Sequence, residues 1–248
     1  MRIAARLSHL LAAGTVVVGC MALTSQSANA SFITYICDDA LCTGGNDTIV
    51  VDNGPGDNFP GSALLGQINS GALSFNGFTI VTNVAQSRPQ IGSAGDPKLD
   101  LTFSAVTNDN LSHTIFLYAS DTHFISSGSF GLGLGGTQSP DGAGNSIRGR
   151  AWGGTSNTNF DISGNLFADL GTSTATPFAL STIGTASSSA NPFSLTIGVQ
   201  ITRDAAGTTT GDLNLSAAPV PEPATAFLFG GSALCLLALR RVLRPVQS

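Results

Sequence analysis

Asp121 and His123 are the residues of this sequence best suited to general-base catalysis. A hydrolase triad would need His113 or His123 to meet a serine and an aspartate on folding. On a strand, positions 121 and 123 share a face, which equally describes a hydrogen-bonded pair that faces solvent. Glycoside hydrolysis needs two carboxylates about 5 to 10 Å apart, a criterion that a chain rich in aspartate meets by chance. We therefore favour the hydrogen-bonded pair and expect no catalytic residues and no enzyme.

The stretch GLGLGG at 131–136 formally matches the dinucleotide-binding pattern G-x-G-x-x-G. That pattern binds a pyrophosphate only where it ends a strand and opens a helix, and here the turn-rich TQSPDGAGN follows. We interpret the stretch as a glycine-rich strand edge or bulge. A P-loop is excluded because the residue directly before Lys98, the single lysine of this sequence, is proline rather than glycine. No cofactor is expected.

Arg148, Arg150 and Trp152 occupy alternate positions, so on a strand they share one face. An exposed tryptophan beside guanidinium groups can stack on a sugar ring, which makes these residues a candidate sugar contact. The alternative, which we favour, places Trp152 in the core and the arginines at an edge.

Asp47, Asp52 and Asp57 lie in or beside turns rich in glycine and asparagine, where they could offer oxygen ligands to Ca²⁺. Their spacing does not match an EF-hand loop. Capping of turns by aspartate side chains explains them at least as well. We favour capping and predict no metal site.

Two of the four cysteines, Cys37 and Cys42, lie outside the apolar segments at the chain ends. In an exported protein such a pair favours a disulfide that closes a small loop. Zinc would need two further ligands, and the available histidines lie far along the chain. The sequence therefore predicts the disulfide.

The elements between 31 and 216 are predicted to be short strands joined by turns. Apolar and polar residues alternate over 99–105 and again over 195–202, as in half-buried antiparallel strands. Ten short apolar or alternating segments are predicted as strands: FITYI, TIVV, ALSF, FTIVTNV, LDLTFSAV, HTIFLYA, FGLGLG, IRGRAW, FSLTIGVQITR and DLNLSA. Nine or ten strands without a fixed repeat predict one all-β domain over 31–216, an antiparallel β-sandwich, for which the jelly roll is one candidate topology.

The first thirty residues have the three parts of a secretory signal. Two arginines precede an apolar stretch over 10–23, and small residues stand at 28–30. We expect cleavage after Ala30 and export. The alternatives are a lipoprotein signal acylated at Cys20 and an uncleaved anchor, for which the apolar stretch is short against a bilayer core of about 30 Å.

The C-terminal end combines a proline-rich spacer at 217–223 with an apolar run and an arginine cluster within 224–248. The prolines favour extended backbone, and the run over 224–239 carries no charge. As a helix it would be about 24 Å long. The arginines that follow predict a transmembrane helix whose cytoplasmic end is fixed by Arg240, Arg241 and Arg244, with the domain outside.

Val220, Pro221, Glu222 and Pro223, followed by this helix and its arginines, closely resemble the PEP-CTERM sorting signal of Gram-negative bacteria that make exopolysaccharide. The resemblance covers about a tenth of the chain. It implies that a membrane-embedded exosortase recognises the tail and processes it near Pro-Glu-Pro, so that the helix is a transient inner-membrane anchor. The alternative is a plain single-pass anchor.

Together these features predict an exported protein of the cell surface or exopolysaccharide matrix, with a structural or adhesive role. Exosortase, the membrane and exopolysaccharide are the expected partners. Fourteen aspartates and no glutamate between 31 and 218, against four arginines and one lysine, exclude a nucleic-acid partner, since phosphates need a basic surface. The alternative functions are a carbohydrate-binding or polysaccharide-hydrolysing surface protein and a plain membrane-anchored sandwich.

Overall fold

The computed structural model describes residues 31–58, 65–140, 142, 144–187 and 191–218. The predicted signal peptide at 1–30, the sorting motif and the C-terminal helix with its arginines lie outside these residues. Within the described part of the chain, no helix is long and apolar enough to cross a membrane.

The described residues form thirteen β-strands and no helix. The strands are β1 (Ile33–Cys37), β2 (Thr48–Val51), β3 (Gln67–Asn69), β4 (Leu73–Phe75), β5 (Phe78–Gln86), β6 (Lys98–Thr107), β7 (His113–Phe124), β8 (Gly128–Ser139), β9 (Ser146–Gly153), β10 (Asn165–Ser173), β11 (Phe178–Ala186), β12 (Phe193–Arg203) and β13 (Gly207–Ala217). All ten predicted segments coincide with strands. The expected number was too small because β3, β10 and β11 were not predicted.

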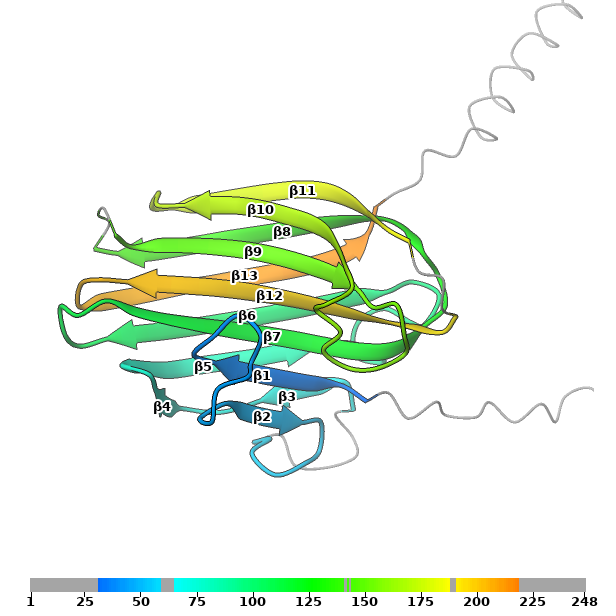
Figure 1. Cartoon of the computed structure of the whole chain (residues 1–248), viewed down its shortest axis with the longest axis horizontal. Helices are drawn as coiled ribbons and strands as arrows, with labels where there is room; N and C mark the ends of the chain where they lie inside the picture. The colour runs from blue at the N-terminus through cyan, green and yellow to red at the C-terminus, as the bar shows by residue number, and fades with distance from the viewer. Residues whose placement is uncertain (1–30, 59–64, 141, 143, 188–190, 219–248) are drawn as a thin grey trace, which may run out of the picture.

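Two antiparallel sheets pack face to face and form a β-sandwich (Figure 1). Sheet A has the order β10-β9-β12-β7-β1-β2, and sheet B has the order β11-β8-β13-β6-β5-β3, with β4 paired to β5. From β6 to β9 the chain passes from one sheet to the other at every connection, so sequence neighbours lie in opposite layers. β10 and β11 lie along one edge of the sandwich, opposite β2, β3 and β4 (Figure 1).

The main core lies between the sheets and consists of the inward-facing residues of both. On β6 every second residue is buried, from Leu99 to Ala105, as the alternation predicted. On β8 the buried apolar residues are Phe130, Leu132 and Leu134. Burial of apolar surface on both inner faces stabilises the sandwich.

A second apolar cluster covers the outer face of sheet A. The Tyr118 ring lies 5.9 Å from the ring of Trp152 and 5.0 Å from the ring of Phe160, and Tyr35 stacks on Phe160 at 4.2 Å. Phe160 belongs to the loop between β9 and β10, which therefore folds back over the sheet. Because of this cover, β12 is buried on both faces from Phe193 to Val199, where the sequence predicted a half-buried strand.

A disulfide joins Cys37 to Cys42 and closes a loop beside this cluster. Within the loop, the carbonyl oxygen of Ala40 accepts a hydrogen bond of 2.8 Å from the hydroxyl of Tyr118. Cys37 is itself buried in the cluster. The disulfide loop and the β9–β10 loop thus close much of the outer face of sheet A.

Candidate functional site

The outer face of sheet B carries a row of glycines on β8. The buried residues of this strand have even numbers from Phe130 to Leu134, so Gly131, Gly133 and Gly135 face outward. A Cβ atom added to Gly135 would meet no other atom within 4 Å. The absence of side chains at these positions leaves a trough along β8, between the neighbouring strands β11 and β13.

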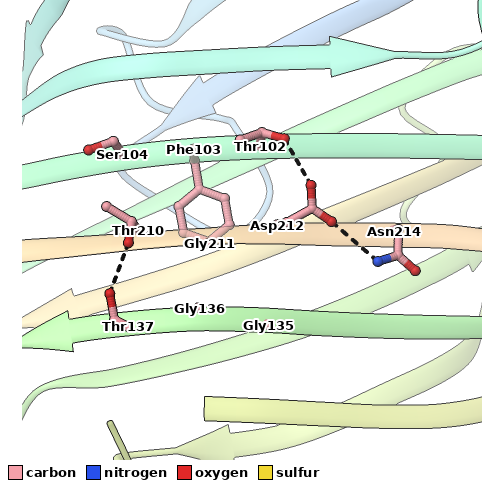
Figure 2. A pocket seen from close by; sticks show the side chains of 10 residues that line it. All are labelled: Thr102, Phe103, Ser104, Gly135, Gly136, Thr137, Thr210, Gly211, Asp212 and Asn214. Carbon is pink, nitrogen blue, oxygen red and sulfur yellow. Dashed lines mark hydrogen bonds between the residues drawn. The ribbon is translucent and has the colours of Figure 1, made fainter. Parts of the chain in front are cut away.

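Polar side chains of β13 and β6 form one wall of this trough, which we call the groove (Figure 2). Two hollows of about 560 and 410 Å³ share Asn214 and together make up the groove. They are lined by Thr102, Phe103, Ser104, Gly131, Leu132, Gly133, Gly135, Gly136, Thr137, Ser181, Thr182, Ile183, Thr210, Gly211, Asp212, Asn214 and Ser216. Hydroxyl, amide and carboxylate groups therefore border a floor of bare backbone.

Hydrogen bonds hold the wall side chains in place. The hydroxyl of Thr102 donates to Asp212 Oδ2 at 2.8 Å, and the amide of Asn214 donates to Asp212 Oδ1 at 3.2 Å. The hydroxyls of Thr137 and Thr210 lie 3.0 Å apart across the floor (Figure 2). A ligand would thus meet donors and acceptors whose directions are largely fixed before it binds.

The wall is acidic where β6 and β13 meet. Asp100 pairs with Asn214 and Asp212 pairs with Thr102 in the register of the two strands, so the aspartates are diagonal neighbours on the outer face. Burial, followed by the charge of Asp212 and a hydrogen bond with it, raises the pKa of Asp100 to about 6.

An apolar side chain borders the second hollow. Ile183 of β11 is 72% exposed and lies opposite Gly131 in the strand register. Ser181, which pairs with Gly133, lies two residues along the same strand. The groove therefore combines an exposed aliphatic surface with hydrogen-bonding groups, and its open form suits an extended polymer better than an enclosed small molecule.

The candidate sugar contact predicted on β9 lies on the other sheet. Arg148 forms an ion pair with Asp169 of β10, and an Nη2 of Arg150 donates to the side-chain oxygen of Gln200 at 2.9 Å. Trp152 is 7% exposed and belongs to the second apolar cluster. The three residues share a strand face as predicted, but the tryptophan ring is not open for stacking in this structure.

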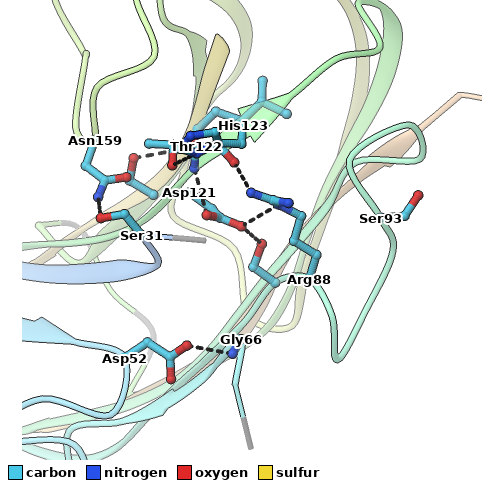
Figure 3. Close-up of polar contacts among 12 residues, drawn as sticks. Ser31, Asp52, Gly66, Arg88, Ser93, Asp121, Thr122, His123 and Asn159 are labelled. Atoms are coloured by element: carbon cyan, nitrogen blue, oxygen red, sulfur yellow. Dashed lines mark hydrogen bonds and ion pairs between the residues drawn. The ribbon is translucent and has the colours of Figure 1, made fainter. Parts of the chain in front are cut away.

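Asp121 and His123, the candidate catalytic residues, lie two positions apart near the end of β7 (Figure 3). Asp121 is fully buried, where it accepts a 2.6 Å hydrogen bond from the hydroxyl of Ser87 and lies 3.4 Å from Nε of Arg88. His123 has a positive φ of 62°, and its ring bonds to the hydroxyl of Thr122. The two side chains thus take different partners and Asp121 is buried, so the prediction of a hydrogen-bonded pair that faces solvent is wrong. The hydroxyl of Ser87 is buried as well.

The three aspartates considered as calcium ligands do not form one group. Asp52 accepts a 2.7 Å hydrogen bond from the backbone N–H of Gly66 (Figure 3), and Asp57 accepts one of 3.0 Å from the N–H of Asn53. Both therefore cap backbone groups, which agrees with the interpretation that the sequence favoured.

Asp47 instead lies beside Asp38 and Asp39, with carboxylate oxygens within 4.8 Å of one another. Burial and the neighbouring charges raise the pKa of Asp47. Asp39 accepts hydrogen bonds from the backbone N–H groups of three residues in the disulfide loop, at Leu41, Thr43 and Gly44. Its oxygens are thus engaged by the loop, and we assign no metal site there.

The groove was not predicted, although the pattern that produces its floor is present in the sequence. The alternation of glycine with leucine over 130–135 places every glycine on one face of a strand. The stretch was interpreted as a strand edge or bulge. The structure corrects this, because β8 lies between β11 and β13 and pairs with both without a register shift. The ion pair between Arg148 and Asp169 could not be predicted either, because it depends on which strands are neighbours, and a local sequence pattern does not give that order.

The fold and the groove define the chain as an antiparallel β-sandwich with an open, polar, mildly acidic groove on one sheet. No family model matches the sequence, and no curated protein matches it.

Several solved structures are similar in part. One holds N-terminal modules of endo-1,4-β-D-xylanase 10B from Clostridium thermocellum with xylohexaose, at 12% identity and a TM-score of 0.33, over 61% of this chain and 28% of that chain. A second is a mannan-recognising carbohydrate-binding module, at 11% identity and a TM-score of 0.29, over 66% of this chain and 95% of that chain. A third is a promiscuous carbohydrate-binding module of the β-sandwich superfamily, at 11% identity and a TM-score of 0.31, over 74% and 71%.

Proposed function

We propose that the protein is an exported β-sandwich, of jelly-roll type, that binds polysaccharide through the groove on sheet B. Its role is adhesive or structural rather than catalytic. The observation that carries this proposal is the combination of a bare glycine floor on β8 with fixed polar side chains along its wall. Sugar hydroxyls both donate and accept hydrogen bonds, and the wall offers hydroxyl, amide and carboxylate partners for them.

The shape of the groove supports a polymer ligand. The two hollows adjoin at Asn214, so together they extend along the direction of β8. Ile183 supplies an apolar patch for the C–H groups of a sugar ring. An extended ligand can gain many weak contacts along such a surface without being enclosed.

Export and sorting complete the proposal. A secretory signal at 1–30 and a PEP-CTERM-like tail at 217–248 would deliver the sandwich to the cell surface or exopolysaccharide matrix, where polysaccharide is present. This part of the proposal is supported by the residues of the two terminal segments alone.

The groove is tested by filling its floor. A side chain at Gly135 would project into open space, so Gly135→Gln keeps the fold and obstructs the groove. Gly45→Gln, in the loop between β1 and β2, is the matched control because a Cβ atom there also meets nothing within 4 Å. Binding of both variants and the wild type is measured by affinity electrophoresis against a panel of soluble polysaccharides and by calorimetry with hexasaccharides.

We expect at least one polysaccharide to retard the wild type and Gly45→Gln equally, and to retard Gly135→Gln at least tenfold less. Retardation that is the same for all three proteins would place the ligand elsewhere. No retardation by any polysaccharide would refute the proposed function.

Sorting is tested separately by intact mass of the protein from surface and membrane fractions of a host with and without its exosortase. We expect a surface form that begins at Ser31 and ends between Pro221 and Pro223, and that is lost without the exosortase. A mass that extends to Ser248 in both strains would exclude processing and leave a plain membrane anchor.

A further inference from the structure

We propose that the carboxylates of Asp100 and Asp212 make the groove selective for neutral glycans over glycans that carry carboxylates, such as uronic-acid polymers. This inference rests on the proposed glycan binding at the same groove and names its ligand class. It assigns a specificity role to two residues that the sequence did not single out.

The positions of the two aspartates support a role in recognition. Asp212 lines the groove, where hydrogen bonds from Thr102 and Asn214 fix both of its oxygens (Figure 2). Asp100 lines neither hollow but lies beside Asp212, as its diagonal neighbour on β6. Two negative groups therefore stand side by side at one point of an otherwise uncharged floor and wall.

The surroundings leave this charge uncompensated. Among the described residues that face outward on β5, β6, β8 and β13, Lys98 is the single cation, and its Nζ lies 3.2 Å from a carboxylate oxygen of Asp96. Gln86, which pairs with Asp100 from β5, is uncharged, and β8 presents glycine and hydroxyl groups. The local field in the groove is therefore negative.

The chemistry of an ionised carboxylate then favours neutral sugars. It accepts hydrogen bonds from sugar hydroxyls, and these bonds are stronger than those between neutral groups. A sugar carboxylate offers no such donor and adds a third negative charge close to the pair. In an open groove, where the effective dielectric constant approaches that of water, repulsion from two charges over about 6 Å lowers affinity about tenfold.

The selectivity depends on pH. The pKa of Asp100, raised to about 6 by burial and by its neighbour, means that the pair loses one negative charge between pH 7 and pH 5. A uronate remains ionised over this range. The preference for the neutral sugar therefore narrows as the pH falls, from about tenfold to about threefold.

The experiment compares sugars that differ only in the oxidation of C6. Calorimetry at pH 7 and pH 5 measures the binding of β-1,4-mannohexaose and β-1,4-hexamannuronate, and of cellohexaose and its uronic-acid counterpart, with EDTA present. The proteins are the wild type, Asp212→Asn, Asp100→Asn, Gly135→Gln and the control Asp109→Asn, which removes an exposed carboxylate outside the groove. Fluorescence of Trp152 verifies that each variant is folded.

We expect the wild type and Asp109→Asn to prefer the neutral sugars about tenfold at pH 7, and each groove variant, which lacks one of the two charges, to prefer them about threefold. An unchanged preference in both groove variants, with binding still abolished in Gly135→Gln, would overturn the inference and leave the proposed function intact. Absent binding of every sugar, or binding indifferent to Gly135→Gln, would overturn both.

A repeat with about 2 mM Ca²⁺ tests whether the two aspartates hold a cation that bridges to the sugar carboxylate. The inference requires that Ca²⁺ leave the neutral preference in place. Tighter binding of the uronates than of the neutral sugars in Ca²⁺ would show that the aspartates hold a bridging cation, and the inference would be wrong.

Discussion

Replacement of Arg203 by methionine should destabilise the sandwich more than any loss of a surface ion pair. Arg203 is fully buried at the hairpin between β12 and β13. Its guanidinium donates to the carbonyl oxygens of Ser139, Ala205 and Thr208 at 3.1 to 3.3 Å, and to the hydroxyl of Thr209 at 2.9 Å. Methionine has a similar length but no donor, so these oxygens would stay buried without their partner.

The magnitude follows from the hydrogen bonds lost. An unsatisfied buried acceptor costs about 1 to 3 kcal/mol, while removal of a buried charge returns part of that cost. We expect Arg203→Met to lower the free energy of unfolding by about 3 to 5 kcal/mol. Arg148→Met is the matched control, because the Arg148 side chain is 36% exposed and its ion pair with Asp169 contributes about 1 kcal/mol or less.

Urea-induced unfolding measures both effects. Trp152 is the single tryptophan of the chain and is buried in the second apolar cluster, so its fluorescence reports unfolding. For a domain of this size the Arg203→Met midpoint should fall by about 2 M, and the Arg148→Met midpoint by less than about 0.5 M. Equal shifts, or a larger shift for Arg148→Met, would refute the reasoning that burial rather than ion pairing determines the cost.

Three further outcomes are expected. Cys37→Ser with Cys42→Ser should lower the free energy of unfolding by about 2 kcal/mol, because the disulfide closes a loop with a sequence separation of 5, and addition of reductant to the wild type should reproduce the effect. Gly184→Ala should lower the melting temperature, since its Cβ would lie 2.0 Å from a backbone oxygen, whereas Gly135→Ala should leave it unchanged; calorimetry distinguishes them. The pKa of Asp100 is raised from 3.8 to about 6, so between these pH values the folded chain retains a proton that the unfolded chain loses. The free energy of unfolding should therefore fall by roughly 1 kcal/mol as the pH rises from about 4 to about 6, after allowance for solvent screening. A urea midpoint that stays constant across this pH window would contradict the prediction.

Most of the strands could be predicted from local pattern, and the exceptions have a physical explanation. β6 alternates strictly because one of its faces is buried and the other is in solvent. β10 and β11 form one edge of the sandwich, and their glycine, serine and threonine residues give a weak apolar period. Edge strands need less apolar surface, so composition alone did not reveal them.

The second apolar cluster, which contains Trp152, and the groove on sheet B could not be predicted, because both depend on contacts between segments that are distant in the sequence. The ring of Phe160 packs on that of Tyr118, which in turn neighbours Trp152, and these contacts join segments that no local period connects. The groove needs β13 and β6 beside β8, a neighbourhood fixed by the crossing of the chain between sheets. The alternating glycines of β8 are visible in the sequence, but they form the floor of a groove only because β13 and β6 supply polar side chains beside them.

Alternate residues of β8 have different tasks, because even-numbered positions face the core and odd-numbered positions face outward. Even positions from Phe130 to Leu134 fill the core, so their size and shape are held by the packing of both sheets. The odd positions differ among themselves: a Cβ atom at Gly135 would meet nothing within 4 Å, whereas one at Gly133 would lie 3.1 Å from the side chain of Asn214. Substitution at Gly135 could therefore reshape the proposed ligand surface while the scaffold remains the same.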